Sequence, residues 1–265
     1  MSTRLTILGC GSSGGVPRIG GLWGNCDPDN PKNARRRCSV LIEKTGPEGT
    51  TTVLVDTSPD LRAQLIDAGV TRLDAVFYTH AHADHVHGID DIRQIVFLMR
   101  ERIKVYADAA TEDALVSRFG YAFVQPADSE YPPILDLQAI DGPMRVNGPG
   151  GEITLTPIPV RHGRIHALGF RVGDLAYIPD VDLIPEESWP LLDNLDCFII
   201  DALRYAPHPS HAHLELTLEW IARAKPERAV LTNMHIDLDY ARVESETPHH
   251  VTPAFDGMVI DVAGA

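Results

Sequence analysis

Short apolar runs, several of them β-branched, alternate along the chain with segments whose apolar positions recur at helical spacing. Runs of this kind predict strands, and a period near 3.6 residues predicts helices. The predicted strands are residues 5–8, 38–44, 52–56, 73–78, 103–107, 152–161, 168–172, 175–178, 195–200 and 228–232. The predicted helices are residues 60–68, 89–98, 111–119 and 214–224. Strands in each half with helices between them indicate an α/β (α+β) chain with two stacked sheets flanked by helices.

Two segments interrupt this pattern with glycine or proline. Residues 9–17 form a glycine-rich loop that either brings backbone N–H groups close to an anion or simply ends the first strand. Residues 125–151 are rich in proline and glycine, and we expect loops with little regular structure there, as a rim or lid segment. The composition does not break anywhere in the manner of a linker, so we predict one domain over residues 1–265.

The segment THAHADH, residues 79–85, concentrates four potential metal ligands directly after the predicted strand 73–78. Many α/β folds place their sites on loops at the carboxyl ends of strands. Imidazole nitrogens and a carboxylate suit zinc, manganese or iron. A tight loop does not aim four ligands comfortably at one ion, so two adjacent ions are the natural interpretation. The alternative is a histidine-rich surface loop.

Three further residues, His162, Asp180 and His235, stand at the ends of predicted strands in separate parts of the chain. Each is either another ligand or an ordinary polar residue at a strand end. Asp56 and Thr79 are candidates for orienting the imidazoles through hydrogen bonds, with capping of strand ends as the alternative. The sequence therefore offers more ligands than one ion needs.

The order His-x-His-x-Asp-His at residues 80–85 resembles the signature of the metallo-β-lactamase superfamily. The resemblance implies a four-layer αββα sandwich with a dinuclear metal site, zinc or manganese, along one edge. The ligands that it implies are His80, His82 and His162 for the first ion, Asp84, His85 and His235 for the second, and Asp180 as the bridge. A hydroxide shared by two such ions can attack a phosphodiester in line. Asp84 is counted both as a ligand and as a catalytic candidate.

Three segments resemble one branch of the superfamily, the phosphoribosyl cyclic phosphodiesterases and their ribonuclease Z relatives. They are residues 9–17, 235–240 and 254–258. This resemblance implies a small cyclic or nucleotide-like phosphodiester as substrate. The chain departs from the branch at Cys26, where a cysteine cluster is missing, and at Leu238, where the branch has a histidine. We therefore expect no structural zinc.

The segment HPSHAHL, residues 208–214, precedes the predicted helix 214–224 and matches the place of an extra, non-ligand histidine in the family. We expect His213 to act as the general acid, with His211 as second choice, because a departing alkoxide needs a proton. The alternative is a loop histidine at a helix start. Two rival functions remain open: a thioesterase resembling glyoxalase II, which needs no general acid, and a non-catalytic binding or carrier protein like the pyrroloquinoline-quinone biosynthesis relatives.

Net charge and composition limit the classes of partner that we expect this chain to bind. A formal net charge of −14 argues against binding to long nucleic acid, which needs clustered cations. The basic run 35–37 either meets a phosphate or is a solvated face. Cys10 and Cys197 lie in or beside apolar runs and are expected to be buried thiols. The N-terminus lacks a signal-peptide pattern and no run has membrane-spanning length, so we expect a cytoplasmic protein with a small-molecule partner, with a homodimer left open.

Overall fold

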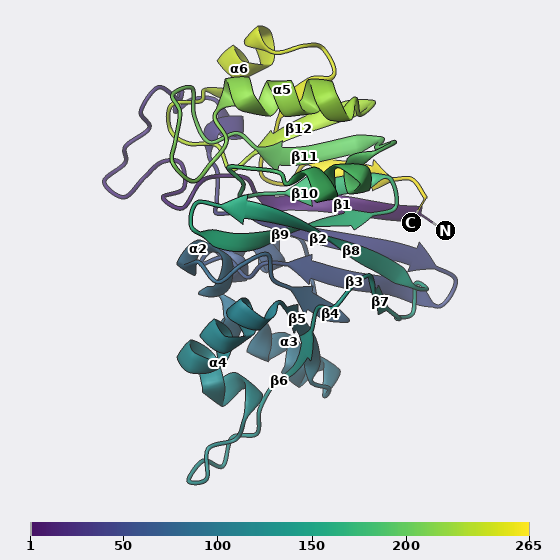
Figure 1. Cartoon of the computed structure of the whole chain (residues 1–265). Coiled ribbons are helices and arrows are strands. Elements are labelled where there is room, and N and C mark those ends of the chain that lie inside the picture. The colour runs from purple at the N-terminus through teal and green to yellow at the C-terminus, as the bar shows by residue number, and fades with distance from the viewer. Residues whose placement is uncertain (1, 265) are drawn as a thin grey trace.

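The computed structural model describes residues 2–264 and contains two seven-stranded β-sheets. The strand order of the first sheet is β14 (Val259–Val262), β1 (Ser2–Gly9), β2 (Ser39–Gly46), β3 (Gly49–Val55), β4 (Ala75–Phe77), β5 (Ile103–Ala107) and β6 (Leu135–Ala139). The order of the second is β13 (Val251–Pro253), β12 (Arg228–Thr232), β11 (Cys197–Asp201), β10 (Leu175–Ile178), β9 (Ile165–Val172), β8 (Ile153–His162) and β7 (Met144–Val146). The sheets stack in the middle of the molecule (Figure 1).

Helices cover the outer faces of both sheets (Figure 1). Those over the first sheet are α1 (Leu61–Asp67), α2 (Ala83–Val86), α3 (Arg93–Met99) and α4 (Ala109–Phe123), with the 3-10 helix η2 (Ile89–Ile92). Those over the second are α5 (Leu214–Ala224) and α6 (Tyr240–Glu246), and the 3-10 helices η1 (Pro31–Asn33) and η3 (Glu186–Leu192) lie in connections. The layers are helix, sheet, sheet and helix, which confirms the expected αββα sandwich.

The first sheet is buried on both faces because its strands alternate between two apolar cores. In β4, Ala75 and Phe77 belong to the core between the sheets, whereas Val76 belongs to the core beneath the helices. Residues 53–55 of β3 repeat this alternation. Successive side chains of a strand point to opposite faces, so an unbroken apolar run is what a doubly covered sheet requires.

Parallel strands bring their carboxyl ends to one edge of each sheet. In the first sheet β3, β4 and β5 are parallel, and in the second β10, β11 and β12 are parallel. The Thr79 carbonyl, just beyond β4, accepts a hydrogen bond of 2.8 Å from the Leu168 N–H of β9. The two sheets therefore touch at the level where the candidate site residues leave their strands.

Residues 125–151 differ from the expectation of irregular loops. They contain β6, which pairs in parallel with β5, and β7, which pairs antiparallel with β8. A glycine- and proline-rich sequence does not favour strands on its own. Hydrogen bonds to β5 and β8 stabilise β6 and β7 instead. The expected helix 89–98 is divided into η2 and α3. Among the described residues, no helix combines the length and the apolar content needed to cross a bilayer.

Candidate metal centre

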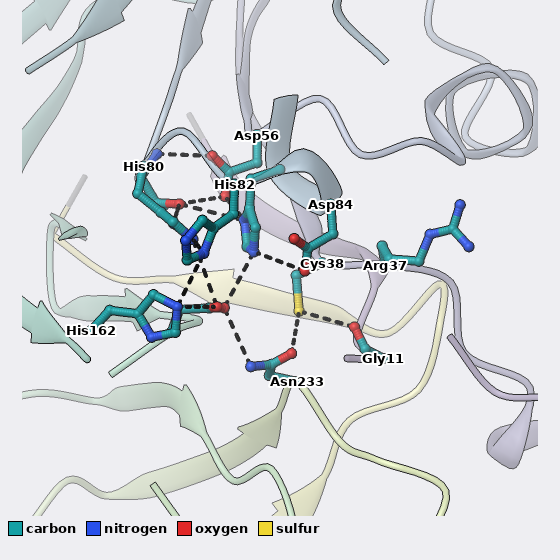
Figure 2. Close-up of polar contacts among 12 residues, drawn as sticks. Gly11, Arg37, Cys38, Asp56, His80, His82, Asp84, His162 and Asn233 are labelled. Atoms are coloured by element: carbon teal, nitrogen blue, oxygen red, sulfur yellow. Dashed lines mark hydrogen bonds and ion pairs between the residues drawn. The ribbon is translucent and has the colours of Figure 1, made fainter. Parts of the chain in front are cut away.

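The loop after β4 gathers three histidines around one point. His80 and His85 are buried, and their ring centroids lie 4.3 Å apart. His82 is the extended residue before α2, with φ −67° and ψ 152°, and its Nδ1 lies 3.0 Å from Nε2 of His80. The short helix α2 turns the chain back, which returns His85 to the side of His80. Figure 2 shows the side chains of His80 and His82 directed toward one another.

A fully buried carboxylate, Asp56, braces this loop. Asp56 follows β3 with a φ of 64° and accepts hydrogen bonds of 2.8 Å from both the backbone N–H and the hydroxyl of Thr79. Its Oδ2 lies 2.7 Å from Nδ1 of His85, and the Thr79 hydroxyl lies 3.0 Å from Nδ1 of His80. These contacts confirm that Asp56 and Thr79 orient the imidazoles. Burial raises the pKa of Asp56, although His85 and Thr79 oppose that shift.

The second sheet adds His162 and Asp180 to the same point. His162 ends β8, its Nδ1 lies 2.6 Å from the Ser210 carbonyl oxygen, and its Nε2 lies 3.2 Å from Nδ1 of His82. Asp180 follows β10, with Oδ1 3.3 Å from Nε2 of His85 and Oδ2 3.6 Å from Nε2 of His162. Residues far apart in the sequence therefore converge where the two sheets meet.

Three overlapping groups of potential ligands result within residues 2–264, each with its ligand atoms within 4.8 Å of one another. The groups are His80, His82 and His162; His80, His85 and Asp180; and His162, Asp180 and His211.

The donor set fits a divalent metal ion. Nε2 of His85 is buried without a hydrogen-bond partner, and an ion would satisfy it. Burial lowers the pKa of His80 well below its ordinary value and also lowers that of His162. Burial opposes the charge of His85 as well, but Asp180 and Asp56 raise its pKa well above the ordinary value, so an ion bound there would displace a proton. A neutral imidazole is the form that binds a metal. Nitrogen and carboxylate oxygen ligands of this kind suit zinc or manganese.

A second buried carboxylate, Asp201, holds His211 beside these groups. Asp201 ends β11, and its Oδ2 lies 2.9 Å from Nδ1 of His211 and accepts the Val181 N–H at 3.1 Å. Burial raises the pKa of Asp201. Burial also opposes the charge of His211, but Asp201 and then Asp180 raise its pKa to about 9. Asp201 and His211 therefore form a hydrogen-bonded pair directly beside His162 and Asp180.

Asn233 links this pair to the metal groups. It follows β12 with a φ of 59°, a left-handed conformation that asparagine tolerates better than most residues. Its amide nitrogen donates to Oδ1 of Asp180 at 3.3 Å and to Oδ1 of Asp201 at 3.2 Å, and lies 3.1 Å from Nδ1 of His211. Figure 2 shows Asn233 facing the histidines from the second sheet.

Three of the predicted site residues lie apart from these groups. Oδ2 of Asp84 is 3.6 Å from Nε2 of His85, at the margin of the groups. His235 belongs to none of them, because the chain turns at Asn233 and Nδ1 of His235 lies 3.1 Å from Asp237. His213 is the N-cap residue of α5, and in the part of the chain that the structure describes its side chain has no hydrogen bond or ion pair. The structure thus brings His211, our second choice, to the centre instead of His213.

Asp201 and Asn233 are site residues that the sequence reasoning did not single out. Both stand at the ends of predicted strands, 195–200 and 228–232, which is the same signal that identified Asp180. The preference for histidine as a metal ligand drew attention to His235 instead. Position at a strand end was therefore the more informative signal than residue type.

The arginines of the basic run 35–37 are held by acceptors within the protein and do not form a freely solvated face. Arg35 is 2% exposed and donates from Nη2 to the Leu238 carbonyl at 2.8 Å. Arg36 pairs with Asp67 and Asp256, and Arg37 pairs with Asp60 at 2.9 Å. Figure 2 shows Arg37 directed away from the histidines. The run therefore fastens residues before β2 to the rest of the fold.

The cysteines are all free and buried, which confirms the expectation for Cys10 and Cys197. Sγ of Cys26 lies 3.5 Å from the carbonyl oxygens of Ile236 and Leu238. Cys38 lies behind Asn233, with its Sγ 4.0 Å from the amide oxygen. These thiols pack the segments that surround the centre.

Curated proteins similar to this chain include an octanoyltransferase of Porphyromonas gingivalis, 33% identical over 270 residues that cover 98% of this chain and 52% of that protein. A ribonuclease Z of Bradyrhizobium diazoefficiens is 27% identical over 147 residues, which cover 53% of this chain and 45% of that protein. The chain spans about half the length of these curated relatives.

Solved structures show the same fold. A diphosphatase of the PhnP family matches with a TM-score of 0.87 and 32% identity, covering 98% of this chain and 97% of that one. Zinc-bound PqqB of Methylobacterium extorquens matches with a TM-score of 0.74 and 20% identity, over 98% and 100% of the two chains, and shows the fold alone. The family profile described as a beta-lactamase superfamily domain matches residues 51–236. This chain therefore belongs to the metallo-β-lactamase superfamily, which consists largely of hydrolases, and it resembles the branch that includes the PhnP family and ribonuclease Z.

Proposed function

We propose that this chain is a metal-dependent phosphodiesterase for small cyclic or nucleotide-like phosphodiesters, with residues 1–265 acting as one domain. The observation that supports this most is the convergence of imidazoles and carboxylates from both sheets beside the hydrogen-bonded pair of His211 and Asp201. The similarity to a PhnP-family diphosphatase and to ribonuclease Z points the same way. Both relatives are named for acting on phosphate esters or anhydrides or on RNA.

The proposed ligands divide between two divalent ions, zinc or manganese. His80, His82 and His162 would hold one ion, Asp84 and His85 the other, and Asp180 both. His235 as a further ligand of the second ion stays a prediction. When bound, such a pair of ions supplies hydroxide at neutral pH and stabilises negative charge on the phosphate. Asp56 and Thr79 fix the ring orientation of His85 and His80 before any ion binds.

His211 is the proposed proton donor to the departing alkoxide. Asp201 holds Nδ1 at 2.9 Å, which leaves Nε2 as the ring atom that faces the substrate. In the described residues Nε2 of His211 makes no hydrogen bond. A positioned imidazolium both protonates the leaving oxygen and attracts a phosphate oxygen. His213 lacks comparable support, because no neighbouring group fixes its ring.

The test combines metal analysis with a substrate panel. Protein purified without chelator is expected to contain more than one equivalent of metal. It should hydrolyse 4-nitrophenyl phosphodiesters and nucleoside 2′,3′-cyclic phosphates, lose this activity on chelation, and regain it with zinc or manganese. One equivalent or less after supplementation contradicts the two-ion proposal, and hydrolysis of none of these esters contradicts the phosphodiesterase.

A second candidate is acyl chemistry, because the relative with 33% identity is named an octanoyltransferase. The match covers 52% of that protein, so its name does not assign the activity to the matched part. A thioesterase resembling glyoxalase II would need no proton donor, since a thiolate leaves unaided. Adding octanoyl thioesters to the same panel, for wild type and for His211→Ala, distinguishes the phosphodiesterase from the thioesterase. Thioester turnover that is the same in both proteins favours acyl chemistry.

A further inference from the structure

Most of the histidines that we propose as ligands are held by the ring nitrogen that points away from the centre. A hydrogen bond at one ring nitrogen fixes the direction in which the other nitrogen points. In each case Nδ1 makes this contact and Nε2 faces the centre. The contacts are 3.0 Å from His80 to the Thr79 hydroxyl, 2.7 Å from His85 to Asp56 and 2.6 Å from His162 to the Ser210 carbonyl oxygen.

His82 is the exception among these ligands. Its Nδ1 faces the centre, 3.0 Å from Nε2 of His80 and 3.2 Å from Nε2 of His162. Its Nε2 makes no hydrogen bond among the residues that the structure describes, and the residue is exposed, whereas His80 and His162 are buried. No partner on its second ring nitrogen therefore fixes the direction of its ligand nitrogen. The orientation of His82 depends instead on the backbone that carries it.

This backbone is held by an arginine that lies 37 residues further along the chain. Nη1 of Arg118, in α4, donates to the carbonyl oxygen of Ala81 at 2.6 Å. Within residues 2–264 this is the one hydrogen bond of the Arg118 side chain, which forms no ion pair. The Ala81 carbonyl belongs to the peptide group that leads into His82. Because a peptide group is planar, fixing its carbonyl oxygen also fixes where the His82 backbone starts.

The helix that carries Arg118 is a firm support for this contact. Leu115, one turn earlier in α4, is buried in the core beneath the helices, which also contains Val86 of α2. The ring of Phe119 lies against that of His87, directly after α2, with 5.9 Å between the centroids. Helix α4 and the segment around α2 therefore share an apolar core and an aromatic contact in addition to the arginine hydrogen bond.

We propose that Arg118 is a positioning residue for His82 and, through this ligand, for the first metal ion. It holds the backbone of His82, whereas the partners of the other histidines hold their rings. The inference rests on the metal ions of the proposed function and does not depend on the substrate. Arg118 reaches the loop from the solvent side, so its hydrogen bond can be removed without opening the core.

The test measures metal affinity in two variants. Arg118→Met keeps a long side chain without a donor, and Arg118→Lys keeps a donor and the charge. Competition with a chromogenic chelator should show that Arg118→Met binds one of its zinc ions about 5- to 20-fold more weakly than wild type. The other ion should be affected much less, because His85 and its partner Asp56 are unchanged. Arg118→Lys should recover part of the lost affinity.

Arg102→Met is the matched control. Nη2 of Arg102 donates to the Leu135 carbonyl at 2.7 Å, and its side chain is 42% exposed. This hydrogen bond therefore resembles that of Arg118, but Arg102 precedes β5 and lies at the end of the sheet away from the centre. Arg102→Met should bind both ions like wild type. An equal weakening of both ions in Arg118→Met, or no weakening of either, overturns the positioning role.

Hydrogen exchange of the metal-free protein separates this inference from the proposed function. The N–H groups of His85 and His87 donate to the carbonyls of His82 and Ala83, at 3.0 and 3.1 Å, so their exchange reports whether the turn after His82 stays closed. Exchange in residues 79–87 should be faster in Arg118→Met than in wild type. If wild type binds no metal, the proposed function fails and this measurement decides the positioning role on its own. Exchange as slow as in wild type overturns it.

Discussion

The two halves of the centre are each organised around one fully buried carboxylate, Asp56 in the first sheet and Asp201 in the second. Asp56 fixes His85, whose other ring nitrogen faces Asp180 at 3.3 Å. Asp201 fixes His211, whose other ring nitrogen has no partner among the described residues. The same device therefore serves two purposes: one carboxylate orients a ligand, and the other orients a group left free for the substrate.

The halves also differ in how the chain supplies them. The first half comes from Asp56 and the single segment 79–85, whereas the second comes from four separate strand ends and the loop before α5. A contiguous segment keeps its geometry through local hydrogen bonds, such as those of Thr79. The second half has its geometry only when β8, β10, β11 and β12 are assembled. Substitutions that act on one half at a time can separate binding of metal from chemistry.

Asp180→Ala is expected to have the largest effect, because its carboxylate belongs to two of the three ligand groups and also contacts Asn233. Turnover of 4-nitrophenyl phosphodiesters should fall to the background rate, and bound metal should decrease, while circular dichroism shows an intact fold. Asp136→Ala, which removes a half-exposed carboxylate from β6, serves as the control. A variant that keeps both ions and wild-type turnover shows that Asp180 does not join the halves.

His211→Ala is expected to lower turnover of alkyl phosphodiesters by about 10²–10⁴-fold, the usual range for general acid catalysis. The loss should be smaller for aryl esters, whose phenolate leaves without a proton, and metal content should not change. His213→Ala is a matched control two residues away, and its turnover should stay near wild type. Equal losses on alkyl and aryl esters would assign His211 to phosphate binding, and loss of metal would make it a ligand.

Much of the first half could be predicted from the sequence, because residues 79–85 contain four potential metal ligands in one stretch and follow an apolar strand. The same reasoning reached His162 and Asp180 through their strand ends. It did not single out Asn233, whose place beside Asp180 depends on a left-handed φ of 59° that the residue type alone does not reveal.

The choice between His211 and His213 was undetermined for a similar reason. His213 is the residue at which the chain enters α5, with φ −94° and ψ 161°, whereas Ala212 is held to Val181 by a backbone hydrogen bond that leaves His211 facing Asp201. These contacts come from elements distant in the sequence. The strand β6 shows the same limit, because its pairing with β5 overrides a local composition that favours loops.

Asp56→Asn and Asp201→Asn compare the two carboxylates directly. Asp56→Asn should weaken metal binding by about 10–100-fold, the usual cost of losing the partner of a ligating histidine. Asp201→Asn should lower turnover without weakening metal binding to the same degree, because it orients His211. Competition with a chromogenic chelator measures the affinity, and steady-state kinetics at saturating metal measures the turnover. Equal losses of metal affinity in both variants would show that Asp201 supports metal binding as much as Asp56 does.

The smallest expected effect is on stability and concerns Asn233, the residue that joins the halves. Its amide donates to both Asp180 and Asp201, and its φ of 59° lies in the region that favours glycine. Asn233→Gly removes the amide but tolerates this φ, so the free energy of unfolding should fall by roughly 1–3 kcal/mol, the cost of leaving buried acceptors unpaired. Asn233→Ala removes the same contacts and adds a strained backbone, so its free energy of unfolding should fall by about 1 kcal/mol more.

Urea unfolding with and without chelator measures the stability of both variants, since bound ions replace the lost partner of Asp180. Equal stabilities of the two variants would show that the left-handed turn costs little, and a glycine variant as stable as wild type would show that the amide does not stabilise the junction.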